Sequence, residues 1–192
     1  GTLGGTGIGN LGIAGNVTMT SLFAGPVTLE VYGDISAGNI LTRSNNIANI
    51  GSITNQFNTI FARATSAQYA DLAENYVADH NYVPGTVVDF GGAYEITISD
   101  TDMSTAVAGV VSSNPAYLMN NNQQGTYVIA VALQGRVKTR VQGPIRKGNM
   151  LVSAGNGMAR AETFPHIGTV IGKALEDFDG REGTIEIVVG VR

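Results

Sequence analysis

Asn49-Ile-Gly-Ser-Ile-Thr-Asn-Gln-Phe-Asn-Thr-Ile-Phe-Ala-Arg-Ala-Thr-Ser-Ala-Gln-Tyr-Ala-Asp-Leu-Ala-Glu-Asn-Tyr76 joins two parts of the chain that differ in composition. The residues before it are rich in Gly, Asn and Thr and carry almost no charge. The residues after it have the mixed composition of a compact β domain. We therefore expect a repetitive β shaft at residues 1–45, a linker or neck at 46–80 and a β head domain at 81–192.

The first part is built from short alternating apolar and polar runs that end in Gly-Asn or Gly-Asp, as in Val27-Thr-Leu-Glu-Val-Tyr-Gly-Asp-Ile35. Such runs are typical of short strands joined by turns. These strands are too short and too polar to form a core alone, so we expect another copy of the chain to cover their apolar face. A flexible linker is the alternative. Against it stands the regular recurrence of apolar residues, namely Ile8, Leu11, Ile13, Val17, Met19, Val27, Leu29, Val31, Ile35 and Ile40.

The head region contains an internal repeat, in which three glycines recur at one constant spacing. Its two parts, at about 83–133 and 146–192, each close with a Gly-Thr strand, and the second closing strand comes five residues early. The repeat predicts two related β units packed into one small sandwich or barrel. The glycine pairs that define the spacing are Gly85 and Gly148, Gly92 and Gly155, and Gly109 and Gly172.

Helix signals are scarce in this chain. Only residues 67–78, with Tyr69, Leu72, Ala73 and Tyr76 at helical spacing, predict a short helix. The sequence thus indicates a mainly β protein.

Composition excludes several function classes. Charged residues make up 14% of the chain, the net charge is -4 and the pI is near 5.0, which argues against a nucleic-acid or anionic-membrane partner. No apolar run approaches the roughly 18 residues of a membrane span. The absence of Cys excludes disulfides and thiolate metal sites. Because the chain does not begin with Met, we expect it to be a fragment or a processed product.

Three stretches resemble a known family. Asn49–Ala62 resembles the linker that leads into the C-terminal domain of many bacteriophage tail fibres. Tyr69-Ala-Asp-Leu-Ala-Glu74, Gly109-Val-Val-Ser-Ser-Asn-Pro115 and Gly135-Arg-Val137 are similar to that domain. They are more distantly similar to the autoproteolytic intramolecular-chaperone domain of phage neck-appendage and tail-spike proteins. The resemblance covers about residues 47–192. It implies a homotrimer with an intertwined shaft of the β-helix or β-prism type, whose C-terminal domain nucleates trimerisation.

The autoproteolytic relatives also imply candidate catalytic residues. In them the cut lies just before a Ser upstream of an acidic motif, which corresponds here to the Thr65-Ser66 bond. The resemblance implies Ser66 as nucleophile and Asp71 or Glu74 as general acid and base. Gln68 and Leu72 alter the acidic motif of the relatives. The structural alternative makes Ser66 a turn residue and Asp71 a cap of the short helix, and we expect no enzymatic activity.

Metal and cofactor signals are weak. His80 and His166 are the only histidines, too few for a three-ligand zinc site without carboxylates, and both lie beside turn residues. Glu176–Gly180 superficially resembles a calcium loop but lacks the terminal bidentate Glu. We expect surface loops at these positions, and neither a metal nor a cofactor.

Three functions remain open. The first is structural, as the distal C-terminal part of a phage tail fibre. The second is host recognition through loops on the β scaffold, although aromatic residues total only 7% and there is no Trp to stack on sugars. The third is self-cleavage by an intramolecular chaperone. The candidate receptor-binding residues are Tyr117, Asn120, Asn121, Asn122, Asp177 and Asp179.

The resemblance also implies partners and a location. The expected partners are further copies of the chain, other phage tail or baseplate proteins, and a host-surface glycan or protein. Neither nucleic acid nor membrane insertion is expected. The protein is expected in the virion, as part of the tail fibre, after synthesis in the host cytoplasm.

Overall fold

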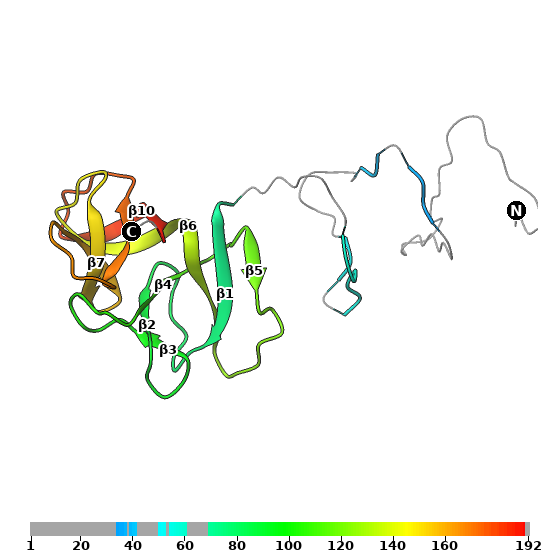
Figure 1. Ribbon diagram of the computed structural model, residues 1–192, viewed down its shortest axis with the longest axis horizontal. Helices are drawn as coiled ribbons and strands as arrows, with labels where there is room; N and C mark the ends of the chain where they lie inside the picture. Colours follow the sequence, from blue (N-terminus) through cyan, green and yellow to red (C-terminus); the bar gives the residue numbers. More distant parts are fainter. Residues whose placement is uncertain (1–33, 38, 42–49, 53, 61–68, 191–192) are drawn as a thin grey trace, which may run out of the picture. The chain divides into compact units, whose positions relative to one another are not determined.

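The computed structural model describes residues 34–37, 39–41, 50–52, 54–60 and 69–190, which belong to two compact units, Gly1–Phe61 and Ala62–Arg192 (Figure 1). The predicted shaft falls almost wholly outside the described residues, so its intertwined β structure stays a prediction. The described residues of the first unit include one local turn, in which the Ser52 amide donates to the Asn55 carbonyl at 2.9 Å.

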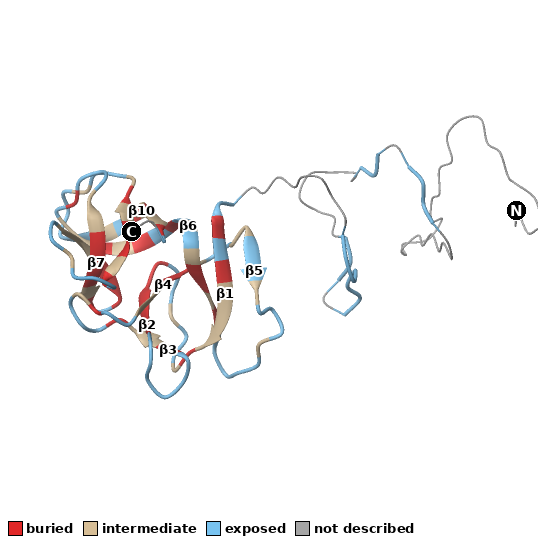
Figure 2. Ribbon diagram, viewed as in Figure 1, coloured by how far each residue is buried: buried red, intermediate tan, exposed pale blue. Residues whose placement is uncertain are grey.

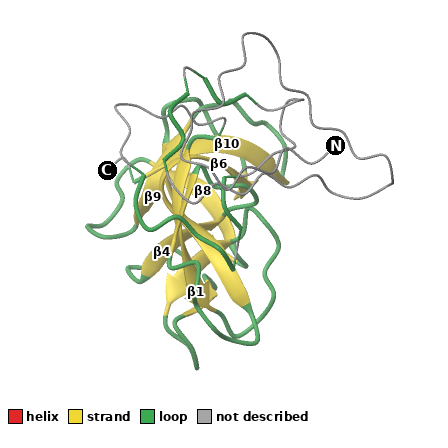
Figure 3. Ribbon diagram, turned by 90° about the vertical axis from the view of Figure 1, so that its right-hand side faces the viewer, coloured by secondary structure: helices red, strands yellow, loops and turns green. Residues whose placement is uncertain are grey.

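The second unit is built from strands and loops, and its described residues contain no helix (Figure 3). The predicted mainly β fold is confirmed for this part of the chain. The strands are β1 (Asp71–Val77), β2 (Val87–Phe90), β3 (Ile96–Ile98), β4 (Val107–Val111), β5 (Tyr117–Met119), β6 (Val128–Gln142), β7 (Met150–Gly155), β8 (Met158–Glu162), β9 (Val170–Ala174) and β10 (Glu182–Val189).

The C-terminal half of β6 and strands β7 to β10, which we call the second strand set, form a closed five-stranded barrel. The strands follow one another in the order β6, β8, β7, β9 and β10, and β10 returns to β6 along the paired positions from Glu182 to Val189. The β6–β8 pairing is parallel, with Val141 opposite Ala159, and the other pairings are antiparallel. Closure removes the free edges that an open sheet would leave.

Strands β1 to β4 and the N-terminal half of β6, which we call the first strand set, follow the same order. Strand β6 pairs with β4, β4 with β2 and β2 with β3. Strand β1 lies antiparallel to β6, and a single parallel bridge between Ala78 and Ile96 joins the end of β1 to β3. Strand β5 is an addition that pairs in parallel with β1.

Equivalent backbone features recur in the two strand sets at the spacing that separates Gly85 from Gly148. The Ala78–Ile96 bridge corresponds to the Val141–Ala159 pair of the second strand set. The bulge between Val88 and Asp89 corresponds to the one between Leu151 and Val152. Gly85 and Gly148 both have a φ of 88°, and their amides donate at 2.8 Å to the carbonyls of Val111 and Ala174.

A smaller hydrophobic core lies inside the first strand set and a larger one inside the second, where the buried positions of the strands meet (Figure 2). The larger core also includes Val87, Val110 and Ala132 of the first strand set. Side chains alternate between the two faces of a strand, so residues at alternate positions of a strand enter the same core. The buried members of the smaller core are Ala78, Val88, Ile96, Val111, Ile129 and Val131. Their counterparts in the larger core, in the same order, are Val141, Leu151, Ala159, Ala174, Ile187 and Val189. The members of the first four pairs are as far apart in the sequence as Gly85 and Gly148. The members of the last two pairs are five residues closer, because the second closing strand comes five residues early.

The short helix predicted at residues 67–78 is wrong, because Asp71–Val77 forms strand β1. Asp71 and Ala73 are buried whereas Leu72 between them is exposed, which is the alternation of a strand. Strand β1 pairs with β5 on one side and with β6 on the other. Backbone hydrogen bonds to two neighbours outweigh the weak helical preference of this segment.

Candidate functional site

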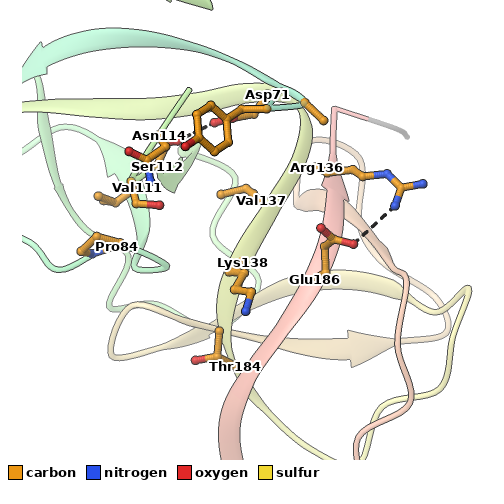
Figure 4. Close-up of a pocket in the computed structure, with 13 residues that line it drawn as sticks. Asp71, Pro84, Val111, Ser112, Asn114, Arg136, Val137, Lys138, Thr184 and Glu186 are labelled. Atoms are coloured by element: carbon orange, nitrogen blue, oxygen red, sulfur yellow. Dashed lines mark hydrogen bonds and ion pairs between the residues drawn. The ribbon is translucent and has the colours of Figure 1, made fainter. Parts of the chain in front are cut away.

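A hollow with a volume of about 560 Å³ lies where the two strand sets of the second unit meet (Figure 4). The start of β1, the residues that follow β4, the middle of β6 and part of β10 form its walls. Its lining residues are Tyr69, Ala70, Asp71, Pro84, Val111, Ser112, Ser113, Asn114, Arg136, Val137, Lys138, Thr184 and Glu186.

The three head-region stretches that carry the family resemblance converge on this hollow. The stretch 69–74 contributes Asp71, the stretch 109–115 contributes Ser112, and the stretch 135–137 contributes Arg136. They are far apart in the sequence and meet because β1 and β4 both pair with β6. The hollow is therefore the place where the sequence motifs acquire a common geometry.

Gly135 allows the start of β1 to approach β6 closely. Its φ is 102°, in the region that favours glycine, and a Cβ at this position would overlap the carbonyl oxygen of Ala70. The same carbonyl accepts a hydrogen bond from the Arg136 amide at 3.2 Å, and the Asp71 carbonyl accepts one from the Ala116 amide at 2.9 Å. These contacts fix the backbone that carries the Asp71 side chain.

Asp71 and Ser112 form a hydrogen-bonded pair at one side of the hollow. The Ser112 hydroxyl donates to Oδ2 of Asp71 at 2.5 Å, and the Asp71 residue is only 4% exposed. A buried carboxylate needs such donors to offset its lost hydration. It can also accept a proton from a hydroxyl group, which is the role of a general base.

The opposite side of the hollow carries charged residues of β6 and β10 (Figure 4). Arg136 Nη1 lies 3.4 Å from Glu186 Oε2, and Lys138 lies directly opposite Glu186 in the strand register. The Arg136 side chain is 58% exposed, so this ion pair contributes little to stability. Both cations remain accessible to a polar group entering the hollow.

Comparison with solved structures shows which known fold this architecture is similar to. No family model and no curated protein matches the chain. Among solved structures, pre-mature bacteriophage phi29 gene product 12 matches with a TM-score of 0.54 and 14% identity over 72% of this chain. The chain shares its fold with this gene product 12. The match covers 24% of gene product 12, so the chain spans about a quarter of that protein.

Two further phi29 structures match with lower TM-scores. The C-terminal fragment of gene product 12 matches with a TM-score of 0.48 and 14% identity, over 64% of this chain and all of that fragment (100%). The N base of the head fibre gp8.5 matches with a TM-score of 0.40 and 15% identity, over 62% of this chain and 93% of that one.

Of the predicted catalytic residues, Asp71 and Glu74 belong to the described part of the chain. Ser66 lies outside the described residues. Asp71 lines the hollow, whereas Glu74 accepts a hydrogen bond at 2.8 Å from the Tyr76 hydroxyl, which lies on the core side of β1. Burial, followed by this hydrogen bond, raises the pKa of Tyr76 to about 12. Asp71 is thus the only one of the two carboxylates placed in the hollow.

The predicted receptor-binding residues near β5 are mostly exposed. Tyr117 is 64% exposed on β5. The Asn120 side-chain amide donates to the Asn75 carbonyl at 3.1 Å, and the Asn120 φ is 53°. Asn121 and Asn122 are exposed residues of the turn that follows.

Asp177 and Asp179 lie in the loop between β9 and β10, in the second strand set. The Lys147 amide donates to Asp177 Oδ1 at 2.7 Å, and Arg146 Nη1 donates to Asp179 Oδ1 at 2.5 Å. These carboxylates stabilise a local turn beside the Ile145–Phe178 bridge. The two predicted recognition loops therefore belong to different strand sets.

His80 and His166 are exposed, as expected for loop positions. Within the described residues no group of three or more His, Cys, Asp or Glu side chains is arranged to hold a metal ion. Nothing helical in that part of the chain has the length and hydrophobicity of a membrane-crossing segment.

Several polar residues that line the hollow of this gene product 12-like fold were not predicted from the sequence. Ser112 and Arg136 lie inside stretches that the family resemblance had already marked, but their chemistry was not singled out. Lys138 and Glu186 carried no signal, because they meet only through the β6–β10 register. A search for charged residues on alternate positions of the long strand would have found Arg136 and Lys138.

Proposed function

We propose that this chain is the distal, C-terminal part of a phage tail fibre, that it forms a homotrimer in the virion and that it contributes to host-surface attachment. The observation that carries the proposal is the fold shared with phi29 gene product 12 over 72% of the chain. The resemblance of residues 49–62, 69–74, 109–115 and 135–137 to tail-fibre C-terminal regions supports it independently.

The exposed apolar residues of the first unit support the homotrimer. In this single chain Ile40 is 82%, Leu41 84% and Ile50 78% exposed. Exposed apolar surface of this kind marks an interaction site. Burial of apolar surface stabilises a protein by roughly 25 cal/mol per Å². In the proposed trimer, the same segments of the two other copies bury these side chains.

The recurrence of backbone features at one constant spacing supports a duplicated head. We propose that the two strand sets derive from one β unit that was copied within the chain, with β6 spanning both copies. The matched bridges, bulges and glycine turns described above support this origin, because unrelated units would have no reason to share a bulge position.

The trimer is tested by the mass of the full chain in solution, measured by light scattering after size exclusion. The expected mass is three times the 19.9 kDa of one chain. A monomer at 19.9 kDa over the working concentration range would refute the trimer.

Host attachment is tested through the loop that follows β5. The variants Tyr117→Ala and Asn121→Ala should reduce adsorption to host cells while the mass stays that of the trimer. Both positions are exposed, so the substitutions should not disturb the fold. Unchanged adsorption of both variants would remove this loop from the attachment surface.

Self-cleavage is the second candidate function, and the position of Asp71 favours it. Asp71 is a buried carboxylate already hydrogen-bonded to a hydroxyl, and it follows Ser66 by five residues. The Ser66 Oγ would attack the Thr65 carbonyl carbon, and Asp71 would pass the hydroxyl proton to the departing amide nitrogen. Water would then hydrolyse the resulting ester.

Mass spectrometry of the chain during prolonged incubation tests this candidate. The parent chain should yield a new C-terminal fragment beginning at Ser66, and Ser66→Ala and Asp71→Asn should abolish it. Glu74→Gln is the matched control and should still cleave, because Glu74 contacts Tyr76 and not Ser112. An intact parent chain would exclude self-cleavage.

A further inference from the structure

The loop between β3 and β4, residues 99–106, docks on the second strand set, and we call it the docked loop. The Met103 amide donates to the Ser153 carbonyl at 2.9 Å, and Asp102 forms a β-bridge with Ala154. Arg160 donates to both oxygens of the Asp102 carboxylate, from Nε at 2.6 Å and from Nη2 at 2.9 Å. Ser153 is completely buried as a result.

The turn between β7 and β8, residues 156–157, completes this internal interface from the other side. The Gly157 amide donates to the Ser99 carbonyl at 2.9 Å, and the Gly157 carbonyl accepts from the Val87 amide at 2.9 Å. The Asn156 amide donates to Asp100 Oδ1 at 3.3 Å. A loop of the first strand set and a turn of the second thus interlock within one chain.

The corresponding loop of the second strand set, residues 163–169, is largely uncovered in the single chain, and we call it the free loop. Its Phe164 is 84% exposed and its Ile167 is 100% exposed. The docked loop is mainly polar, whereas the free loop places two large apolar side chains in water. Such exposure is unfavourable unless a partner covers the loop.

The acceptor that corresponds to Ser153 is also uncovered. The spacing that relates Gly148 to Gly85 relates Ser153 to Phe90, which is 48% exposed at the end of β2. The turn that follows, residues 91–95, corresponds to the β7–β8 turn, and its Tyr94 is 55% exposed. Each chain therefore offers one free loop and one free acceptor, and both are apolar.

We propose that the free loop of one copy docks on Phe90 and the 91–95 turn of a second copy, which repeats the internal interface between chains. This inference rests on the proposed homotrimer and names the surface through which its heads meet. A contact between two different surfaces joins copies head to tail, and it closes into a ring when the rotation allows. In a closed ring of three copies, the free loop of every copy is docked on the acceptor of its neighbour.

The side chains at equivalent positions explain why this contact is apolar. The counterparts of Asp102 and Arg160 are Pro165 and Thr97, so the internal ion pair is not repeated. Apolar side chains take the place of this ion pair. The free loop contributes Phe164 and Ile167, and the acceptor contributes Phe90 and Tyr94. A second copy of the chain suits the free loop, because Phe90 and the 91–95 turn of that copy correspond to Ser153 and the β7–β8 turn. Within each chain the docked loop already lies on Ser153 and the β7–β8 turn.

A disulfide between copies tests the geometry, and the chain has no Cys of its own. The counterparts of the bonded Met103 and Ser153 are His166 and Phe90. In the full chain carrying His166→Cys and Phe90→Cys, mild oxidation should give covalent dimers and a closed covalent trimer. A chain carrying His166→Cys and Val83→Cys is the control, because Val83 is 59% exposed and lies outside both docking surfaces.

Substitution of the free loop tests the contribution of the contact. Phe164→Ser with Ile167→Ser should raise the concentration at which the trimer dissociates at least tenfold, measured by light scattering on dilution. An unchanged circular dichroism spectrum would show that the variant folds, since both side chains are exposed in the single chain.

The outcomes separate the two levels of the proposal. A parent chain that stays monomeric refutes the trimer and, with it, this interface. A trimer that gives no more cross-linking than the control pair, and that is unaffected by the serine substitutions, refutes the interface alone.

Discussion

Gly135→Ala should destabilise the head far more than the removal of one glycine from a loop. The substitution acts at the point where β1 meets β6 beside the hollow. The backbone φ of 102° is strained for any residue with a Cβ, and the new methyl group would overlap the Ala70 carbonyl oxygen and lie 2.9 Å from the Asp71 Cα. The start of β1 must therefore move away.

The magnitude follows from these two effects. A residue other than glycine held in this region costs about 1–3 kcal/mol. Moving β1 also breaks the hydrogen bonds from the Arg136 amide to Ala70 and from the Ala116 amide to Asp71, each of which contributes about 0.5–1.5 kcal/mol. We expect a total loss of about 2–6 kcal/mol in the free energy of unfolding.

Gly148→Ala is the matched control. Gly148 has a φ of 88°, but a Cβ there would meet nothing within 4 Å, so only the backbone strain applies. Urea unfolding of both variants at one protein concentration separates the two effects. With a slope of about 2 kcal/mol per M, the Gly135 variant should unfold about 1 M earlier than the Gly148 variant.

Equal unfolding midpoints for the two variants would refute the reasoning, because they would show that β1 does not press on residue 135. Amide hydrogen exchange gives a second readout. The Ala116 amide should exchange faster in the Gly135 variant and at the parent rate in the Gly148 variant, since its partner is the Asp71 carbonyl.

Three further substitutions test other contacts. Hydrogen bonds from Arg160 lower the pKa of Asp102 and of Glu162 below their ordinary values of 3.8 and 4.5, so these contacts stabilise the fold at neutral pH and are lost as the pH falls through the lowered values. Arg160→Gln should lower the melting temperature at pH 7, and the difference from the parent should vanish in acid. Phe178→Ala should cost about 3–5 kcal/mol in urea unfolding, because the ring is packed against three glycines of the barrel. Tyr76 should remain un-ionised while ordinary tyrosines titrate near pH 10, and its contribution to stability should be lost as the pH rises from 10 towards its pKa of about 12. Subtracting the ultraviolet alkaline titration of Tyr76→Phe from that of the parent gives the titration of Tyr76 alone. A difference that titrates near pH 10 would contradict the prediction.

The sequence was informative where one residue type fixes one backbone feature. Gly85 and Gly148 were aligned by their spacing alone, and both occupy the same left-handed turn with the same φ. Alternating apolar residues likewise indicated a β fold, because period-two patterning is a local property that needs no knowledge of partners.

The sequence was misleading where partners decide the structure. The spacing of Tyr69, Leu72, Ala73 and Tyr76 indicated a helix, yet pairing with β5 and β6 draws this segment into the sheet. Its strand alternation is hard to read because Leu72 is exposed while the charged Asp71 is buried.

The candidate site was predictable in part for the same reason. The family motif marked Asp71, but its bond to Ser112 joins residues distant in the sequence and exists only once β1 and β4 lie beside β6. Asp177 and Asp179 were predicted as receptor contacts from their place in a polar loop. In the structure Asp177 accepts a hydrogen bond from the Lys147 amide, and Asp179 accepts one from the Arg146 side chain. The sequence alone does not reveal these bonds.

Strand β6 supplies one wall to each of the two cores. Its 15 residues run without a break from Val128 to Gln142, and both halves are paired on their two sides. A protease cut in the middle of this strand would leave each strand set its own half of β6, but it would break the strand that joins them. The larger core contains Val87, Val110 and Ala132 of the first strand set as well as residues of the second, so neither half alone would keep this core complete. The head has two cores that share strands, and we therefore expect it to melt in a single transition.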